Sequence, residues 1–254
     1  MYDVIIIGAG IAGMTAGIYA VRAGKKVLIL ETRVEGGQII NTVGIENWPG
    51  DLGISGVDLT RKIKEHTEKL GVKFDYFETS RIEKDGGNWK LIDEDGEELV
   101  ARAIVIATGT EPRKMSKKQT ASAGKRPISY CATCDGALYK GKTVVVVGHG
   151  NSAKHEVKYL EGICKKVYQI HHDEEIPEDA EAVFVAIGRI PNTALFEGLV
   201  EIDADGYIVA DENCLTSAPG VFVAGDCRTK ALRQLVTAAS DGAVSATEAI
   251  KYLS

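Results

Sequence analysis

The chain has 254 residues, of which 44% are hydrophobic and 26% are charged, and its formal net charge is −6 at pH 7. This composition predicts an ordinary soluble globular protein of one large or two modest domains. The negative charge disfavours nucleic acid as a partner. No apolar run approaches the roughly 20 residues of a membrane span, and no signal peptide precedes the first expected strand. We therefore expect a cytoplasmic location.

The N-terminal segment predicts a nucleotide-binding unit. An apolar strand, YDVIII, leads into a glycine turn, a helix and a second strand, KKVLILE, which ends at Glu31. Gly8, Gly10 and Gly13 form the pattern G-x-G-x-x-G at the turn. Such glycines permit a tight turn and close approach of a pyrophosphate to the backbone, and an acid placed like Glu31 can accept hydrogen bonds from a ribose.

The middle of the chain predicts a helix over 57–70 and short antiparallel strands over 72–102, broken by DGGN and DEDG turns. Residues 111–129 are polar and without periodicity, which is typical of a linker. A second strand-turn-helix-strand follows, KTVVVVGHGNSAKHEVKYLEGICKKVYQI, and is a weak repeat of the first unit. The apolar strand AVFVAIG and a C-terminal helix from about Arg233 complete the expected elements.

A close cysteine pair, Cys131 and Cys134 in YCATCDG, is the most specific feature of the sequence. A C-x-x-C pair can close a small disulfide loop, and its first thiol can have a lowered pKa and act as a nucleophile. Half of a zinc site and two core cysteines are the alternatives. Zinc needs four ligands, and Cys214 and Cys227 form no second close pair, so we expect no metal. We interpret these two and Cys164 as structural.

Several motifs together resemble the low-molecular-weight thioredoxin reductases, which are two-domain flavoprotein disulfide reductases. These motifs are CATCDG, IVIATG (104–109), VFVAGDC (221–227), GGQ (36–38) and NWPG (47–50), and the resemblance covers almost the whole chain. It implies an α/β fold with two Rossmann-like units. The FAD-binding domain would be discontinuous, 1–111 and 191–254, with a small redox domain inserted at 112–190. Likeness to this family also implies a homodimer whose domains rotate.

The same resemblance assigns cofactor and catalytic residues. The residues expected to bind FAD are Gly8, Gly10, Gly13, Glu31, Gly37, Gln38, Asn47, Ala107, Thr108, Gly109, Gly225, Asp226, Arg233, Gln234 and Leu235. A helix beginning near RQLVTAAS would place its positive end near the flavin pyrimidine. By analogy, Cys134 is the thiol nearest the flavin, Cys131 attacks the disulfide of thioredoxin, and Asp135 is the acid that reprotonates a thiolate.

The second glycine unit departs from the family, in which it binds NADPH. Gly148, Gly150 and Ala153 keep G-x-G-x-x-A, and His171 holds the position that Glu31 has in the first unit. The family usually follows that histidine with arginines that clamp the 2′-phosphate, whereas six of the nine residues over 173–181 here are acidic. A parallel crossover usually needs a dozen or more residues, and the ten residues 172–181 cannot hold a helix.

A reduced, clamp-less second domain resembles the pyridine-nucleotide-independent, ferredoxin-dependent thioredoxin reductases. We therefore expect ferredoxin as the electron donor. Ferredoxins are acidic, and a basic docking face would come from Arg113, Lys114, Lys117, Lys118, Lys125 and Arg126, although a solvated hinge explains these charges equally well. Two other functions stay open: a disulfide reductase with a compact NADH or NADPH site, and a non-catalytic flavin-binding redox sensor. The intact CATCDG sequence counts against the sensor.

Overall fold

The computed structural model describes all 254 residues, and the chain divides into two compact units. Unit 1 comprises residues 1–110 and 191–254, and unit 2 comprises residues 111–190. Two short strands, β7 (Thr110–Pro112) and β12 (Arg189–Pro191), pair with each other where the chain passes from one unit to the other. None of the helices has the length and apolar character that crossing a membrane requires.

A seven-stranded sheet forms the centre of unit 1, with neighbouring strands in the order β3-β2-β1-β6-β5-β4 and with β13 paired to β6. The long strand β6 pairs with β1 in parallel from Ala101 to Ile106, with β5 through its first half, and with β13 through its second half. The strands are β1 (Tyr2–Ile7), β2 (Val27–Leu30), β3 (Lys73–Asp75), β4 (Arg81–Asp85), β5 (Asn88–Ile92), β6 (Glu98–Ile106) and β13 (Val221–Val223).

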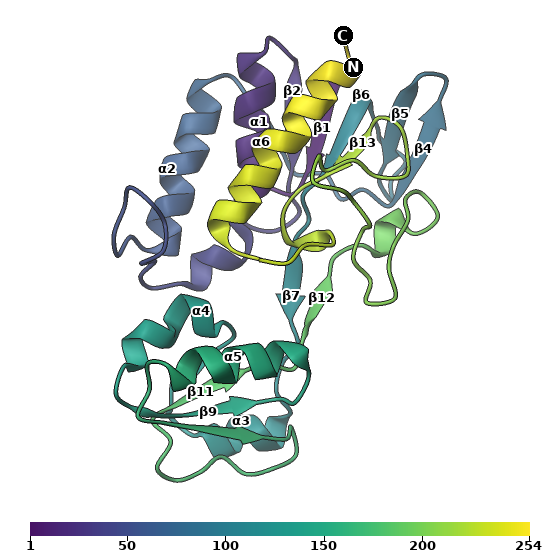
Figure 1. Ribbon diagram of the computed structural model, residues 1–254. Coiled ribbons are helices and arrows are strands. Elements are labelled where there is room, and N and C mark those ends of the chain that lie inside the picture. The colour runs from purple at the N-terminus through teal and green to yellow at the C-terminus, as the bar shows by residue number, and fades with distance from the viewer. The chain divides into compact units, whose positions relative to one another are not determined.

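Alternate side chains of β1 point to opposite faces of this sheet, and each face carries a hydrophobic core. Val4 and Ile6 are buried on one face, where helices α1 (Ile11–Arg22), α2 (Gly56–Lys69) and α6 (Leu235–Tyr252) pack (Figure 1). Ile5 and Ile7 are buried on the other face, beneath residues of β5 and of the segment 195–227. Three short 3₁₀ turns complete the unit: η1 (Gly37–Asn41), η3 (Ala194–Phe196) and η4 (Gly225–Cys227).

Unit 2 has a parallel four-stranded sheet in the order β10-β9-β11-β8. Helix α5 (Asn151–Glu161) and the short helix α4 (Ala132–Asp135) pack on one face, while α3 (Lys117–Ala123) covers the other. The remaining elements are β8 (Ile128–Ser129), β9 (Thr143–Val147), β10 (Lys166–Ile170), β11 (Ala182–Val185) and the 3₁₀ turn η2 (Gly136–Tyr139). The α/β class with two Rossmann-like units, which the sequence predicted, is confirmed.

Two predicted segments were wrong. The segment 111–129 is not a linker: it forms β7, α3 and β8, and Ser116 caps α3 by accepting a hydrogen bond from the Gln119 backbone N–H at 3.2 Å. The segment lacks a helical hydrophobic periodicity, but Met115 and Ala123 are buried against the sheet and this packing stabilises the helix. In addition, β3 lies parallel to β2 rather than in the antiparallel meander, which is limited to β4, β5 and β6.

The shortened crossover between β10 and β11 contains no helix, as the sequence predicted. It still passes over β9, because β9 lies between the two strands that it connects. Ile176 and Ala180 are buried against the same face as α3, and the Ile176 N–H donates to Ser122 Oγ at 3.1 Å. A segment of turns and irregular residues therefore covers part of the sheet where a longer crossover would place a helix.

Candidate functional site

The first glycine turn has the geometry of a pyrophosphate cradle. Gly8 has a φ of +111°, in the left-handed region, and a Cβ there would lie 2.4 Å from the Ala107 carbonyl oxygen. A Cβ on Gly13 would lie only 1.9 Å from the Gly8 carbonyl oxygen, so α1 approaches the strand more closely than any side chain permits. A Cβ on Gly10, in contrast, would meet open space. The turn therefore leaves backbone accessible at the helix N-terminus, where an anionic group is favoured.

Glu31 lies beside this cradle at the end of β2. One carboxylate oxygen accepts from the Ala9 N–H at 3.0 Å, and the other accepts from the backbone N–H groups of Thr32 and Arg33 at 2.9 and 3.0 Å. These bonds hold the carboxylate next to the glycine turn. Gly37 and Gln38 follow in η1, at the same end of the sheet, where the Gly36 N–H donates to the Ala9 carbonyl oxygen at 2.8 Å.

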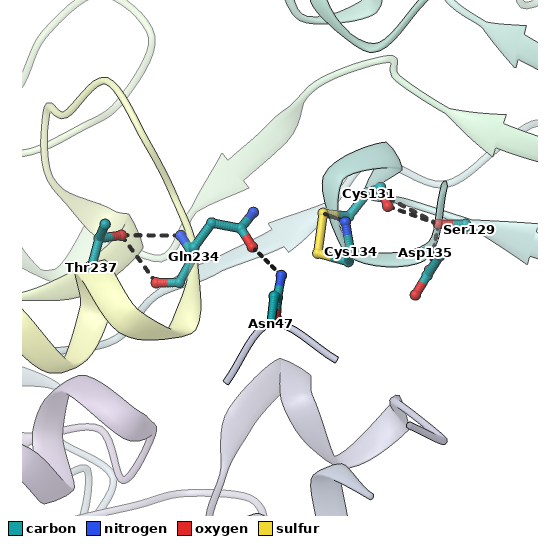
Figure 2. Close-up of a disulfide and its surroundings, with 7 residues drawn as sticks. All are labelled: Asn47, Ser129, Cys131, Cys134, Asp135, Gln234 and Thr237. Atoms are coloured by element: carbon teal, nitrogen blue, oxygen red, sulfur yellow. Dashed lines mark hydrogen bonds between the residues drawn. A yellow bond between two sulfur atoms is a disulfide. The ribbon is translucent and has the colours of Figure 1, made fainter. Parts of the chain in front are cut away.

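A second part of unit 1 is built around the start of α6. Gln234 caps this helix through a reciprocal pair of hydrogen bonds with Thr237, and its side chain accepts from Asn47 Nδ2 at 3.1 Å (Figure 2). Arg233 donates to the carbonyl oxygens of Asp226 and Arg228 at 3.2 and 3.0 Å. Hydrogen bonds thus bring together three stretches that were predicted to bind FAD and that are far apart in sequence: Asn47, Asp226 and residues 233–235.

The stretch after β6 is held by hydrogen bonds within unit 1. Thr108 Oγ1 donates to the Asn192 carbonyl oxygen at 2.7 Å, and Asn192 Nδ2 donates back to the Thr108 carbonyl oxygen at 3.0 Å. The Asn192 N–H also donates to the Gly109 carbonyl oxygen at 3.0 Å. These bonds fix the end of β6 beside the glycine turn, since Ala107 N–H donates to the Ile7 carbonyl oxygen at 2.8 Å.

Sequence reasoning missed a buried charge cluster that supports the loop 225–230. Asp241 of α6 accepts from Arg228 Nε and Nη2 at 2.9 and 2.8 Å, from Lys230 Nζ at 2.7 Å and from the Gly225 N–H at 3.0 Å. Burial raises the pKa of Asp241, but the hydrogen bonds from Arg228 and Lys230 outweigh it and keep the pKa below its usual value. No local spacing in the sequence links these residues. The one available signal was a single aspartate within a largely apolar helix.

The cysteine pair lies in unit 2, where Cys131 and Cys134 form a disulfide with a Cα–Cα distance of 5.3 Å (Figure 2). Cys131 caps α4, and its Sγ accepts from the Cys134 N–H at 3.2 Å. Ser129 braces the pair, because its Oγ accepts from the Cys131 N–H at 3.1 Å and donates to Asp135 Oδ2 at 2.6 Å. Both cysteines are half-buried, so the disulfide is accessible to a reaction partner.

The other three cysteines are poorly placed for thiol chemistry. Cys214 and Cys227 are fully buried, and Cys164 is half-buried. Burial raises the pKa of Cys214 to about 12 and also raises the pKa values of Cys227 and Cys164. A thiol with a raised pKa carries little of the reactive thiolate at neutral pH, which agrees with the structural role assigned to these residues from sequence.

The second glycine turn follows β9 and repeats the geometry of the first. Gly148 has a φ of +134°, a Cβ on Gly150 would meet nothing within 4 Å, and Ala153 is fully buried. The imidazole rings of His149 and His171 stack, with centroids 3.6 Å apart and planes inclined by 3°. The position that an acid holds in the first unit is thus occupied by a stacked imidazole in the second.

The fold and these sites define an oxidoreductase that acts on disulfides with a bound dinucleotide cofactor. The sequence model of the pyridine nucleotide-disulphide oxidoreductases matches residues 2–179 and 170–242. The chain belongs to this family. Its cofactor is FAD, and the open, glycine-lined cradle of unit 1 fits the pyrophosphate of that group.

Individual relatives narrow the comparison. The thioredoxin reductase of Listeria monocytogenes is 36% identical over 301 aligned positions, covering 100% of this chain and 94% of the relative. The crystal structure of thioredoxin reductase from Streptococcus pyogenes superimposes with a TM-score of 0.91 at 33% identity, covering 100% of this chain and 98% of that one. A ferredoxin-flavin thioredoxin reductase from Clostridium acetobutylicum gives 0.64 at 28% identity, covering 99% and 97%.

Proposed function

We propose that the protein is a thioredoxin reductase in which electrons pass from the flavin to the Cys131–Cys134 disulfide and then to thioredoxin. When bound, FAD supplies the two electrons that convert the disulfide to a dithiol. The observation that carries the proposal is the half-buried C-x-x-C disulfide, held by Ser129 and followed by Asp135, in a chain similar over its whole length to proteins named thioredoxin reductase.

Disulfide exchange with thioredoxin takes two proposed steps at the cysteines. The Cys131 thiolate attacks one sulfur of the thioredoxin disulfide, forms a mixed disulfide and displaces the other sulfur as a thiolate, which takes up a proton. Cys134 loses its proton and attacks Cys131 Sγ, which restores the Cys131–Cys134 disulfide and releases the second thiolate of thioredoxin. Asp135 is the acid proposed to deliver a proton, and its hydrogen bond from Ser129 keeps the carboxyl group beside the pair.

A serine variant tests which thiol lies nearest the flavin. Cys134→Ser removes the sulfur that we place against the isoalloxazine ring, whereas Cys131→Ser leaves it. We expect Cys134→Ser to abolish the thiolate-dependent change in the flavin absorption spectrum of the reduced protein, and Cys131→Ser to retain it. Identical spectra for the two variants would refute the assignment. Loss of thioredoxin reduction in both variants is expected in either case.

We propose further that ferredoxin, rather than NADPH, reduces the flavin. Three carboxylates, at 173–175, follow His171 and His172 where a phosphate clamp is needed, and carboxylates repel a 2′-phosphate. The crossover to β11 is an irregular segment without a helix. Arg113, Lys114, Lys117, Lys118 and Lys125 are exposed and offer a basic surface to an acidic partner.

Two structural details bear on this surface. Arg126 does not belong to it, because its guanidinium is turned inward and donates to the carbonyl oxygens of Ala180 and Glu178 at 2.6 and 2.9 Å. The acidic residues 173–175 line a cavity of about 310 Å³ together with Lys118, so they reduce the positive charge at one edge. We therefore place the proposed docking surface at Arg113, Lys114, Lys117 and Lys125.

Anaerobic reduction of the FAD-loaded protein tests the donor. We expect rapid bleaching of the flavin by reduced ferredoxin and little by stoichiometric NADPH or NADH. Lys117→Glu should slow reduction by ferredoxin about tenfold at low ionic strength, and the difference should shrink as salt is added. Lys158→Glu, at an exposed position on α5, is the matched control. Rapid bleaching by either nicotinamide nucleotide, with none by ferredoxin, would overturn the proposal.

A nicotinamide-dependent enzyme is the second candidate, because Gly148 and Gly150 keep the open turn that a dinucleotide needs. The bleaching experiment distinguishes the two donors directly. We also propose a homodimer located in the cytoplasm, and the mass of the purified protein in solution tests the first of these statements.

A further inference from the structure

One carboxyl group of unit 2 lies on the buried side of its helix. Ala153, Glu156 and Leu160 are spaced by three and four residues on α5 and therefore share one face of the helix. Ala153 and Leu160 are fully buried in the cluster that also contains Ala132 of α4. Glu156 thus projects into the layer between α5 and α4, and its Oε2 is buried without a hydrogen-bond partner.

The group that faces this carboxyl belongs to the cysteine motif. Ala132 directly follows Cys131, and its backbone N–H is one of the first-turn donors of α4 that have no partner within the helix. Burial raises the pKa of Glu156 to about 7, while the Ala132 backbone N–H and the positive charge of Arg189 act in the opposite direction. The carboxyl therefore changes its charge within the neutral pH range.

The elements packed against α5 bring few other ionisable groups to this carboxyl. On α4 and the turn after it these are the two cysteines, Asp135 and Tyr139. Strand β9 has none, and Lys166 and Tyr168 of β10 bond to each other and to Asp179. Tyr168 packs with the cluster on the opposite face of the sheet. Arg189 is the only charged side chain that shifts the pKa of Glu156.

We propose that Glu156 is a positioning residue for the redox pair and that its charge controls the ionisation of Cys131 in the dithiol state. An ionised carboxylate at the first turn of α4 attracts the Ala132 N–H and repels a thiolate on the neighbouring Cys131. A neutral carboxyl does neither. Reduction of the disulfide adds two electrons and leaves the pair needing protons, so in the reduced protein Glu156 and Cys131 compete for one proton and titrate as a coupled pair.

This coupling has a consequence for disulfide exchange. When Cys131 ionises, Glu156 takes up a proton, so that an attacking thiolate forms without adding a second negative charge to the buried layer. When Cys131 is joined in the mixed disulfide, the proton can leave Glu156 again. The inference rests on the proposed role of Cys131 as the attacking thiol, but not on the identity of the electron donor.

The test is the pH dependence of Cys131 alkylation in the FAD-loaded protein, reduced with dithiothreitol and freed of reductant without oxygen. Iodoacetamide labelling of the peptide containing Cys131 is followed by mass spectrometry between pH 5 and pH 9. We expect two ionisations in the natural protein. Glu156→Gln should show a single ionisation and, above pH 7, where the natural carboxyl is ionised, a rate up to about tenfold higher, the change that a shift of one pKa unit gives. Glu161→Gln, exposed on the same helix, is the control and should follow the natural profile.

A profile of Glu156→Gln that superimposes on that of the natural protein would overturn the inference. Infrared difference spectra of the natural protein provide a second measurement that needs no variant. At pH 7 the reduced protein should show more protonated carboxyl than the oxidised protein, and no increase would also contradict the coupling. Neither experiment uses thioredoxin, ferredoxin or a nicotinamide nucleotide. Failure of the proposed function would therefore appear in turnover assays and would not affect the alkylation profile or the infrared spectra.

Discussion

Replacing Asp241 by Asn should unfold unit 1 more readily than any surface change on the same helix. The side chains of Asp241, Arg228 and Lys230 are 8%, 11% and 7% exposed, and the carboxylate accepts all four of the hydrogen bonds described above. Asn preserves the shape but removes the negative charge and turns an amide N–H₂ toward two cations. Removing one partner of a buried ion pair typically costs about 3–5 kcal/mol, because an uncompensated charge remains buried. A typical domain has only about 5–15 kcal/mol of stability.

Urea unfolding measures this loss. Both tryptophans, Trp48 and Trp89, lie in unit 1, so their fluorescence reports the unit that contains the cluster. The matched control is Glu248→Gln on α6, which removes a partly exposed pair with Lys251, whose side chain is 66% exposed, and should cost less than about 1 kcal/mol. A loss for Asp241→Asn no larger than that of the control would refute the reasoning.

The pH dependence of the same difference follows from the sign of the pKa shift. The pKa of Asp241 is lower in the folded protein than its usual value. The ionised carboxylate therefore contributes its full stability above the unfolded pKa of about 3.9, and the contribution is lost as the pH falls through the lower, folded pKa. The gap between the natural protein and Asp241→Asn should be equal at pH 7 and pH 5 and should narrow below about pH 4.

Two further predictions concern the cofactor cradle and the free thiols. Gly13→Ala places a methyl group 1.9 Å from the Gly8 carbonyl oxygen, so we expect loss of most bound FAD, measured as flavin absorbance per polypeptide. Gly87→Ala, which meets open space, should bind flavin normally. In the oxidised, folded protein a thiol reagent should label at most Cys164, whereas three thiols should react in guanidinium chloride; rapid labelling of Cys214, whose pKa is raised to about 12, would contradict the structural role of that residue.

Short-range features were the parts of the site that could be predicted from sequence. Each glycine turn requires only a strand, a helix and glycines at positions where a side chain would clash or the backbone would be strained. Both turns have the expected geometry. The cysteine pair is three residues apart and closes its disulfide locally. The crossover of 172–181 was predicted to lack a helix because its length alone forbids one, and this prediction is confirmed.

Long-range packing decided the rest. Helix α3 was missed because five of its seven residues are polar and the segment is aperiodic. It is stabilised by Ala123 and the preceding Met115, which pack against a distant sheet. Asp241 meets Arg228 and Lys230 only because α6 packs along the loop that follows β13. The sequence by itself determined the nucleotide turns and the redox pair, since steric rules act between neighbours along the chain. Tertiary structure alone shifted the pKa values of Glu156 and Asp241, because the burial and the partners that set a pKa come from segments that meet only after folding.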